Sequence, residues 1–322
     1  MRGLKTIAMY IGRVQTNLSH LFQSNFHKIT IHSLHLPFNY SLYMILIADS
    51  GSTKTDWLLI HNTNNTYIST SGINAYYMTS ETIIDMLKKE LLPLIPYEQV
   101  TSIYFYGSGC STEAKCAKMS TIFNLLFTKA SVEINHDMLA AARALFGNKQ
   151  GIACILGTGS NSCVYDGNKI TRQMVSLGYF FGDEGSGTHM GKLLITDYLR
   201  GEMPSNISNK LNSEFNLSLE VVLDHIYNKS TPNKFLSSFA PFILENSTDD
   251  YIRKLIAYSF DEFLKMGVMK FTGYKKMDVN FVGSIAFHFQ DILRGVASSR
   301  EIQINKVQKS VIDGLKEFHT GK

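Results

Sequence analysis

The chain has 322 residues, of which 44% are hydrophobic and 18% are charged, a composition typical of globular proteins and unlike that of disordered chains. The formal net charge of +4 resides in residues 1–43, which hold four basic side chains and no acidic one, so the remainder is neutral. This balance excludes a basic nucleic-acid-binding surface, and no apolar run reaches the roughly 20 residues of a membrane span. The length favours two domains.

The first 43 residues are expected to lie outside the fold. They lack the apolar stretch of a secretory signal, and Met44 directly precedes the first convincing strand. An acid-free, basic segment is also typical of an organelle transit peptide, which is the alternative. The four cysteines form no C-x-x-C pair and no zinc-ligand spacing, so we expect a protein of the reducing cytoplasm.

Strands and helices alternate through the first half of the chain. An apolar strand at 45–48 leads into a polar turn and a second strand at 57–60, and an asparagine-rich hairpin turn follows at 62–65. This strand–turn–strand start differs from a P-loop, where a helix follows the glycines. The further elements predicted are helices at 79–94, 112–129 and 139–146 and strands at 102–106 and 131–135.

A second, similar cycle begins at Gly151. A strand at 151–156, a glycine-rich turn at 157–160 and a returning strand at 163–165 repeat the first unit, which indicates a duplicated architecture. Residues 188–271 follow a helical pattern, and a strand at 279–282 precedes a final strand and a helix. We therefore predict an α/β fold with lobes at 44–150 and 151–322, and a ligand in the cleft between them. The C-terminal helix could pack back on the first lobe.

Two polar turns carry residue types that bind phosphate. The first, at 49–55, reads Asp-Ser-Gly-Ser-Thr-Lys-Thr, and the second, at 157–161, reads Gly-Thr-Gly-Ser-Asn. Small residues let backbone N–H groups approach an anion, the hydroxyls of Ser52, Thr53 and Thr55 add donors, and Lys54 adds charge. Either turn alone is better explained as an ordinary polar β-turn. Two of them on matching frames favour a phosphate clamp.

Three more segments have both a structural and a functional interpretation. Asp137, between a strand and a helix, is either a helix cap or a general base. The turn at 182–187, Gly-Asp-Glu-Gly-Ser-Gly, either caps a helix or accepts hydrogen bonds from sugar hydroxyls. The segment at 281–286 places Gly283 and Ser284 after a buried strand, either as a helix start or as a surface for a nucleotide.

Together, in this order, these segments resemble the actin/hexokinase/Hsp70 ATPase superfamily, and most closely its branch of N-acetylglucosamine kinases and BadF/BadG-type ATPases. The likeness covers roughly residues 44–320. It implies a two-lobed, duplicated actin-like (ribonuclease H-like) ATPase fold with an interlobe cleft, and ATP with Mg²⁺ as cofactors. Ser50 stands where the family often has glycine, and the Gly-rich segment at 107–111 fits the family only loosely.

The resemblance also implies roles for single residues. Asp49 would organise Mg²⁺, and Asp137 would be the catalytic base. Positions matching the family's phosphate and nucleotide contacts are Gly51, Ser52, Thr53, Lys54, Gly157, Thr158, Gly159, Gly283 and Ser284. Positions matching its sugar contacts are Asn74, Thr158, Asn161 and Asp183.

The function implied is transfer of the γ-phosphoryl group of ATP to the primary hydroxyl of an amino sugar, foremost N-acetylglucosamine, giving the 6-phosphate. The alternatives are an ATPase that activates a partner enzyme and a sugar-responsive regulator on the same scaffold. The motifs leave the sugar open between N-acetylglucosamine, glucosamine, N-acetylmuramic acid and related compounds. Dimers are common among the enzymes that the chain resembles.

Overall fold

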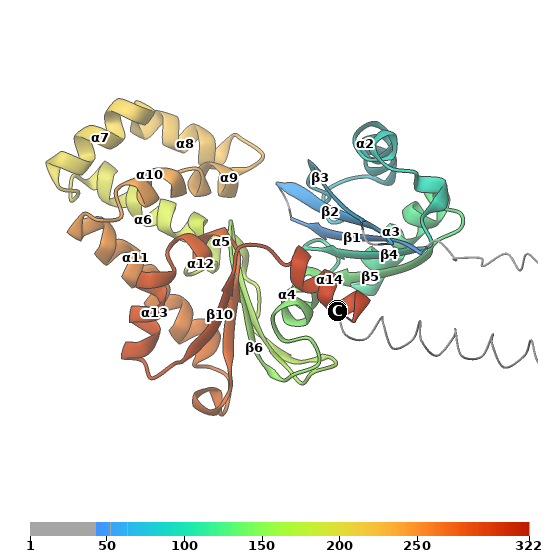
Figure 1. The fold of residues 1–322 in the computed structure, drawn as a ribbon. Coiled ribbons are helices and arrows are strands. Elements are labelled where there is room, and N and C mark those ends of the chain that lie inside the picture. The colour runs from blue at the N-terminus through green and yellow to red at the C-terminus, as the bar shows by residue number, and fades with distance from the viewer. Residues whose placement is uncertain (1–42, 52, 63, 322) are drawn as a thin grey trace, which may run out of the picture. The chain divides into compact units, whose positions relative to one another are not determined.

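The computed structural model describes residues 43–51, 53–62 and 64–321, which contain two five-stranded sheets (Figure 1). The first sheet has the order β3-β2-β1-β4-β5. Strand β2 runs antiparallel to β1 and β3, whereas β4 and β5 run parallel to β1. The bounds are β1 Met44–Ser50, β2 Lys54–His61, β3 Asn64–Ser71, β4 Ser102–Gly107 and β5 Ser131–His136.

The second sheet repeats this topology. Its order is β10-β9-β6-β7-β8, so that β6 takes the central place that β1 has in the first sheet, β7 and β8 correspond to β2 and β3, and β9 and β10 correspond to β4 and β5. Strand β7 is antiparallel to β6 and β8, and β9 is parallel to β6 and β10. The duplicated α/β architecture predicted from the two strand–turn–strand units is therefore confirmed. The bounds are β6 Gly151–Leu156, β7 Ser160–Tyr165, β8 Ile170–Gln173, β9 Val279–Val282 and β10 Ile304–Gln308.

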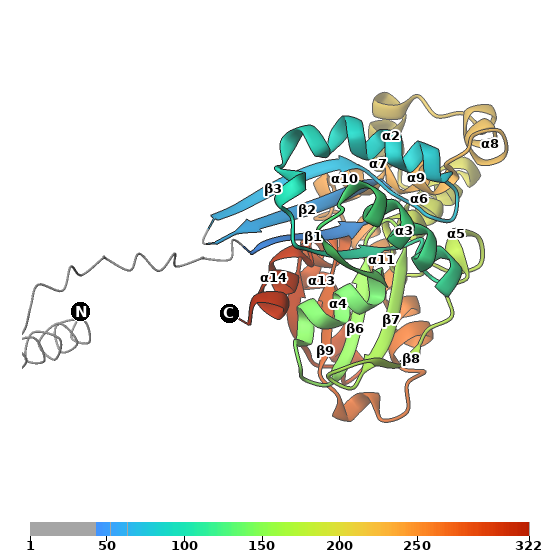
Figure 2. The same cartoon turned by 90° about the vertical axis from the view of Figure 1, so that its right-hand side faces the viewer.

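Each sheet has its own core and its own helices. Helices α2 (Ser80–Glu90) and α3 (Glu113–Leu126) pack on the first sheet, and each begins at a threonine whose side chain accepts a backbone hydrogen bond. The second sheet packs against a larger helical region, which lies to one side of it in Figures 1 and 2. Its members are α6 Gly187–Arg200, α7 Ser205–Phe215, α8 Leu219–Tyr227, α9 Pro232–Ser237, α10 Ala240–Glu245, α11 Asp250–Phe263 and α13 Gln290–Ser299.

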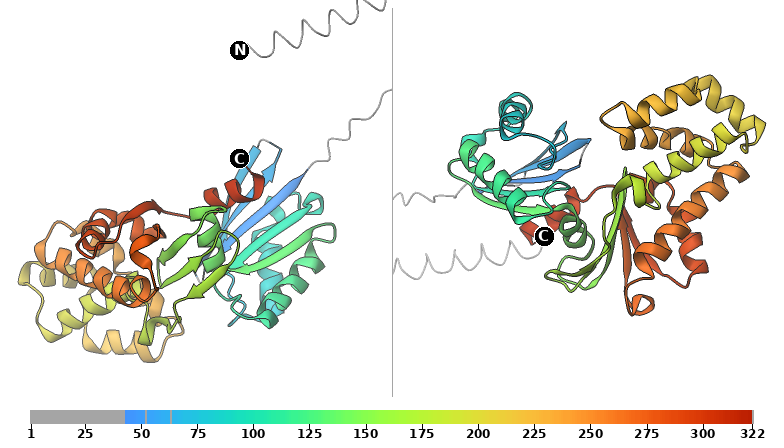
Figure 3. Two further views of the ribbon diagram at one scale, coloured as in Figure 1. Left: turned by 90° about the horizontal axis from the view of Figure 1, so that it is seen from below. Right: turned by 180° about the vertical axis from the view of Figure 1, so that it is seen from behind.

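Two helices lie between the sheets. Helix α4 (Asp137–Phe146) contacts β1, β4 and β5 of the first sheet and β6, β7 and β9 of the second. The final helix, α14 (Ile312–Thr320), follows β10 but packs against α4, β1 and β2 (Figure 3). The two helices share a third hydrophobic cluster with both sheets. Helix α4 is rich in alanine, and such small side chains let it approach its neighbours closely.

Helix α14 is also held to the first sheet by polar contacts. The Tyr67 hydroxyl on β3 donates to an Asp313 carboxylate oxygen at 2.7 Å. The Tyr106 hydroxyl on β4 lies 2.8 Å from Nε2 of His319, and the same hydroxyl accepts a 2.7 Å hydrogen bond from Arg143 of α4. The last helix is therefore part of the structure around the first sheet, although it follows the last strand of the second.

Several elements differ from the sequence-based predictions. The edge strands β3 and β8 were not predicted, because their burial patterns are mostly exposed and show no apolar alternation. The predicted helix at 79–94 ends at Glu90, and a 3₁₀ turn at Leu92–Leu94 holds Pro93. Asn64 and Asn65, expected in the hairpin turn, belong to β3, while Thr63 is outside the described residues.

Residues 1–42 lie outside the described part of the chain, so the expectation for the N-terminal extension stays a prediction, as do the domain boundaries and the ligand cleft. Among the described residues, no helix has both the length and the apolar character needed to cross a membrane.

The contact between α4 and α14 predicts how two helical glycines respond to the same substitution. A Cβ atom added to Gly314 would lie 2.5 Å from the Ala144 carbonyl oxygen, whereas one added to Gly295 in α13 would meet nothing within 4 Å. Gly314→Ala should therefore destabilise the protein by about 1–3 kcal/mol, and Gly295→Ala should stabilise it by about 0.5–1 kcal/mol. Denaturant unfolding of both variants checks this. Equal effects would show that the α4–α14 contact is loose.

Candidate active site

Two aspartates lie at the same edge of the first sheet. Asp49 is near the carboxyl end of β1, where it pairs with Tyr106 of β4, and Tyr106 pairs in turn with Asn135 of β5. Asp137 follows two residues after Asn135, as the first residue of α4. The parallel strands β1, β4 and β5 therefore bring both carboxylates to one edge, although 88 positions of sequence separate them.

Both carboxylates are buried, and the charge of Asp137 makes Asp49 harder to ionise. Burial raises the pKa of Asp49 to about 7, with repulsion from Asp137 and then Asp56 adding to the rise and Lys54 opposing it. Burial also raises the pKa of Asp137, while His136 and the backbone N–H of Met138 oppose that rise. The Met138 N–H donates to Asp137 at 2.8 Å. Buried like charges of this kind favour a bound cation or a shared proton.

The charge of Asp137 affects the pKa of a cysteine near each sheet. Burial raises the pKa of the Cys110 thiol, just beyond β4, and of the Cys163 thiol on β7 to about 12, and the Asp137 charge contributes to both increases. Asp137 is not the N-cap of α4, because His136 occupies that position. The interpretation of Asp137 as the N-cap is therefore wrong, although its carboxylate accepts a hydrogen bond from the Met138 N–H in the first turn of the helix.

The first polar turn is tight and partly tied into the sheet. Gly51 donates its N–H to the Lys54 carbonyl at 3.0 Å, and the Lys54 ammonium group forms a 2.7 Å ion pair with Asp56. Thr53 is exposed and Ser52 is outside the described residues. The expectation that the Thr55 hydroxyl faces an anion is wrong, because this hydroxyl is buried and bonded to Ser50 and Ser71.

Ser50 links this turn to the loop that contains Asn74. Its hydroxyl donates to the Ile73 carbonyl and accepts from the Ile73 N–H, both at 3.0 Å. Asn74 accepts a 2.9 Å hydrogen bond from the Tyr76 N–H and lies against Gly109, where an added Cβ would be 2.5 Å from its side-chain oxygen. Sequence reasoning treated Ser50 only as a departure from glycine and missed this fastening role.

The second polar turn joins β6 and β7 and is supported by the segment around Asp183. The Gly157 N–H donates to the Gly159 carbonyl at 2.9 Å, and the Ser160 N–H donates to Asp183 at 3.2 Å. An added Cβ at Gly159 would lie 3.1 Å from both Asp183 oxygens, so glycine permits this approach. Asp183 has a φ of 61°, an uncommon backbone conformation for aspartate.

Thr158 and Asn161 take different positions around this turn. The Thr158 carbonyl accepts from the Thr188 N–H and hydroxyl at 3.2 and 2.6 Å, which fixes the turn on α6. Asn161 accepts a 2.8 Å hydrogen bond from the Ser162 N–H, and both Thr158 and Asn161 are half-buried. Burial raises the pKa of Asp183, and the Ser160 N–H opposes the rise. The structure thus brings Thr158 and Asp183 together around one turn.

Gly283 approaches the same turn from β9. Its N–H donates to the Gln308 carbonyl at 2.9 Å, its φ is 120°, and an added Cβ would lie 2.2 Å from the Leu156 carbonyl oxygen. No other residue type fits there without moving the backbone. Ser284 is exposed and begins the short helix α12 (Ser284–His288). The predicted nucleotide and phosphate residues of the second sheet therefore converge at the ends of β6 and β9.

Solved structures share this fold. A Porphyromonas gingivalis protein with a provisional assignment as an N-acetylglucosamine kinase is 38% identical, with a TM-score of 0.83, over 87% of this chain and 99% of that one. The chain belongs to the N-acetylglucosamine kinase and BadF/BadG-type ATPase family. A Chromobacterium violaceum protein with the same provisional assignment is 17% identical (TM-score 0.66; 85% and 98% covered) and supports the fold alone. No protein-family model and no curated protein matches the chain.

The residues present fit the cofactors that this kinase and ATPase family implies. Mg²⁺ is usually held by one or two carboxylates together with substrate phosphates and waters, rather than by an all-protein cage. Asp49 offers a single buried carboxylate with a raised pKa beside a polar turn. An added Cβ at Gly157 would meet nothing within 4 Å, which leaves that backbone open to a phosphate.

The raised pKa of Asp49 predicts a pH dependence of stability in metal-free buffer. Between its ordinary value of 3.8 and about 7, the folded protein holds a proton that the unfolded chain has lost, so stability falls as pH rises through this window. Asp49→Asn should reduce that fall and raise the Tm at pH 7 by about 3 °C or more. Thermal unfolding from pH 4 to 7.5 with a chelator checks this, with Asp85→Asn on the exposed face of α2 as control. A profile unchanged in Asp49→Asn would contradict it.

Proposed function

We propose that the protein is an ATP-dependent sugar kinase that phosphorylates the primary hydroxyl of an amino sugar, N-acetylglucosamine or a close derivative. The observation that carries this proposal is the pair of carboxylates, Asp49 and Asp137, at one edge of the first sheet. Asp49 would bind the Mg²⁺ ion of the nucleotide, and Asp137 would accept the proton of the acceptor hydroxyl. Membership of the kinase and ATPase family supports the same conclusion.

Asp137 is the proposed general base. As the hydroxyl oxygen of the sugar bonds to the γ-phosphorus and the bond from that phosphorus to ADP breaks, the hydroxyl proton passes to the Asp137 carboxylate. Burial raises the pKa of this group, which brings its basicity closer to that required near neutral pH. Its place as the first residue of α4 fixes its backbone.

The two polar turns are the proposed phosphate-binding elements. Gly51, Ser52, Thr53 and Lys54 supply the first turn, while Gly157, Thr158 and Gly159 supply the second, with Gly283 and Ser284 beside the nucleoside. Asp49 would hold Mg²⁺, which when bound supplies positive charge against the phosphate oxygens. The side chains of Asn74, Asn161 and Asp183 are the proposed sugar contacts, since amide and carboxylate oxygens accept hydrogen bonds from hydroxyl groups.

Lobe closure is the proposed means of excluding water from the transfer. Helices α4 and α14 lie between the two sheets and contact both sides of the shared hydrophobic cluster. A hinge at this contact would let the second turn approach the first without breaking either sheet. Exclusion of water limits hydrolysis of ATP in the absence of a sugar.

Replacing the proposed base should separate catalysis from binding. We expect Asp137→Asn to lower kcat by at least about a hundredfold while ATP affinity changes little, because the amide keeps the shape but cannot accept the proton. Steady-state kinetics and ATP titration calorimetry measure the two effects. Asp85→Asn is the control, and near-full activity of Asp137→Asn would show that another group acts as base.

The release of ADP should depend on the sugar. A coupled ADP-release assay across N-acetylglucosamine, glucosamine and N-acetylmuramic acid should show at least about tenfold more ADP with the preferred sugar than without any, because the acceptor completes the site. Mass spectrometry should detect the matching sugar phosphate. ADP release at the same rate in the sugar-free blank would favour the partner-activating ATPase instead.

A further inference from the structure

The end of helix α14 carries an imidazole that is enclosed by aromatic side chains. The half-buried His319 ring stacks on the Tyr104 ring, with 3.7 Å between the ring centroids and 20° between their planes. Its Nε2 atom lies 2.8 Å from the hydroxyl of Tyr106, which follows Tyr104 on the same strand, β4. Both tyrosines belong to the hydrophobic cluster that α4 and α14 share with the two sheets, and none of the catalytic roles above uses His319.

The hydrogen bonds around Tyr106 determine the protonation state of His319. An arginine side chain can only donate, so the 2.7 Å hydrogen bond from Arg143 uses an acceptor site of the Tyr106 oxygen. Burial raises the pKa of Tyr106 to about 12, although Arg143 opposes the rise, and the hydroxyl therefore keeps its proton. That proton is available to Nε2 of His319, and this hydrogen bond requires an Nε2 atom that carries no proton. The imidazole in this contact is therefore neutral.

The guanidinium group of Arg143 makes protonation of His319 costly. It forms a 2.8 Å ion pair with Glu133 and lies 4.9 Å from the centroid of the Phe318 ring, beside His319 in α14. Burial, and then the charge of Arg143, lowers the pKa of His319 from 6.5 to about 4, while Glu133 opposes the change. A protonated imidazole would place a second cation on the Tyr106 oxygen and leave the proton of that hydroxyl without an acceptor.

The acidic groups around α14 respond differently to weak acid. Burial disfavours the ionised form of Glu133, but hydrogen bonds from Arg143 and Asn135 outweigh burial and lower the pKa of this carboxyl, so it keeps its charge. Asp313, in the first turn of α14, accepts a 2.7 Å hydrogen bond from Tyr67, and a protonated carboxyl group can still accept such a bond. The residues that β1 and β2 contribute to the shared hydrophobic cluster are apolar.

The contact joins the end of the chain to the helix that begins with Asp137. Arg143 belongs to α4, and Gly314 of α14 lies against Ala144 of the same helix. Because α14 is the last element of the chain and pairs with no strand, it can come away without breaking either sheet. Its departure would remove the side chains that hold one flank of α4.

We propose that α14 is a latch on α4 that is closed while His319 is neutral and that weak acid opens without unfolding either sheet. The inference concerns the fold and does not depend on the proposed kinase activity. Between pH 6.5 and about 4, the open form binds a proton that the closed form does not hold. Opening therefore becomes more favourable as the pH falls through this window.

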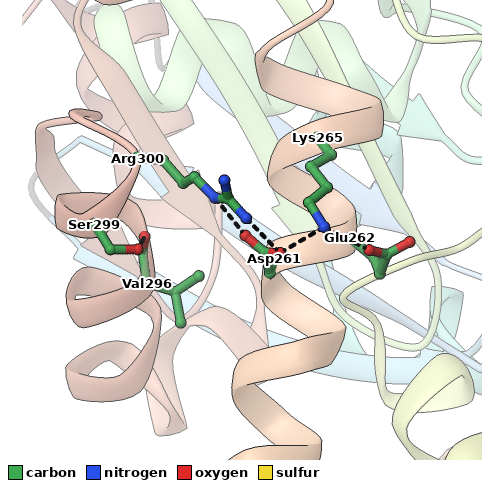
Figure 4. A network of polar contacts seen from close by, with 6 residues as sticks. All are labelled: Asp261, Glu262, Lys265, Val296, Ser299 and Arg300. Carbon is green, nitrogen blue, oxygen red and sulfur yellow. Dashed lines mark hydrogen bonds and ion pairs between the residues drawn. The ribbon is translucent and has the colours of Figure 1, made fainter.

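Hydrogen exchange followed by mass spectrometry locates the opening. The protection of the α14 amide groups, corrected for the intrinsic effect of pH on exchange, should fall at least about tenfold from pH 6.5 to about 4.5. Helix α13 is the internal reference, because it contains no histidine and is followed by Arg300, which binds both oxygens of Asp261 on α11. Asp261 also binds Lys265 (Figure 4).

This reference should be insensitive to the same change in pH. The hydrogen bonds from Arg300 lower the pKa of Asp261, so their ion pair persists in weak acid. A loss of protection that is equal in α13 and α14 would mean that the whole protein unfolds, and the latch would be disproved.

Substitutions identify the group that senses the acid. His319→Gln should remove the pH dependence of α14, because a glutamine carbonyl accepts from the Tyr106 hydroxyl but does not titrate. His288→Gln, at the exposed end of α12, and Asp313→Asn should both keep it. Circular dichroism and Tm at pH 6.5 would show that the variants are folded. A dependence that survives in His319→Gln, or disappears in Asp313→Asn, would contradict the proposal.

The titration of the imidazole can also be observed directly. The histidine side-chain NMR signal that is missing from His319→Gln should titrate near pH 4 in the unsubstituted protein. A midpoint at the ordinary value of 6.5 would show that the closed contact tolerates a charged imidazole, and the latch would then have no sensor.

Discussion

The packing of α4 between the two sheets is the interaction on which the rest of the structure depends. The buried alanines of α4 belong to a hydrophobic cluster that includes residues of both sheets. The first residue of the helix is Asp137. The same helix therefore joins the two halves and places a carboxylate near Asp49 of the first sheet and within electrostatic reach of Cys163 in the second. A bulkier helix would separate the sheets and remove Asp137 from the ends of their strands.

Much of this architecture follows from local sequence signals. Strands β1, β6 and β9 are buried apolar runs, and each ends in small or acidic residues, so their place and their polar ends could be predicted. Strands β3 and β8 are mostly exposed edge strands without an apolar alternation, so their side chains carry little signal. The Gly157 and Asp183 segments were found from glycine content, because close backbone approaches require that residue.

Other features depend on contacts between distant segments and leave no local trace. The Ser50 hydroxyl fastens the Asn74 loop across 23 positions, and the Thr55 side chain is buried rather than facing a ligand. Ser160, Arg172 and Lys270 line one pocket only because β8 pairs with β7 in the tertiary fold. The sequence shows that these side chains are polar, but their hydrogen-bond partners depend on the tertiary fold.

The position of α14 also constrains the order in which the chain can fold. This helix follows the strands of both sheets in the chain, yet Leu315 packs with Ile47 and Leu58 of the first sheet, and Asp313 binds Tyr67. During synthesis, β1 and β2 therefore emerge long before the helix that covers one of their faces. The first sheet is therefore expected to expose apolar surface until α14 has been synthesised, in the manner of segments that engage chaperones.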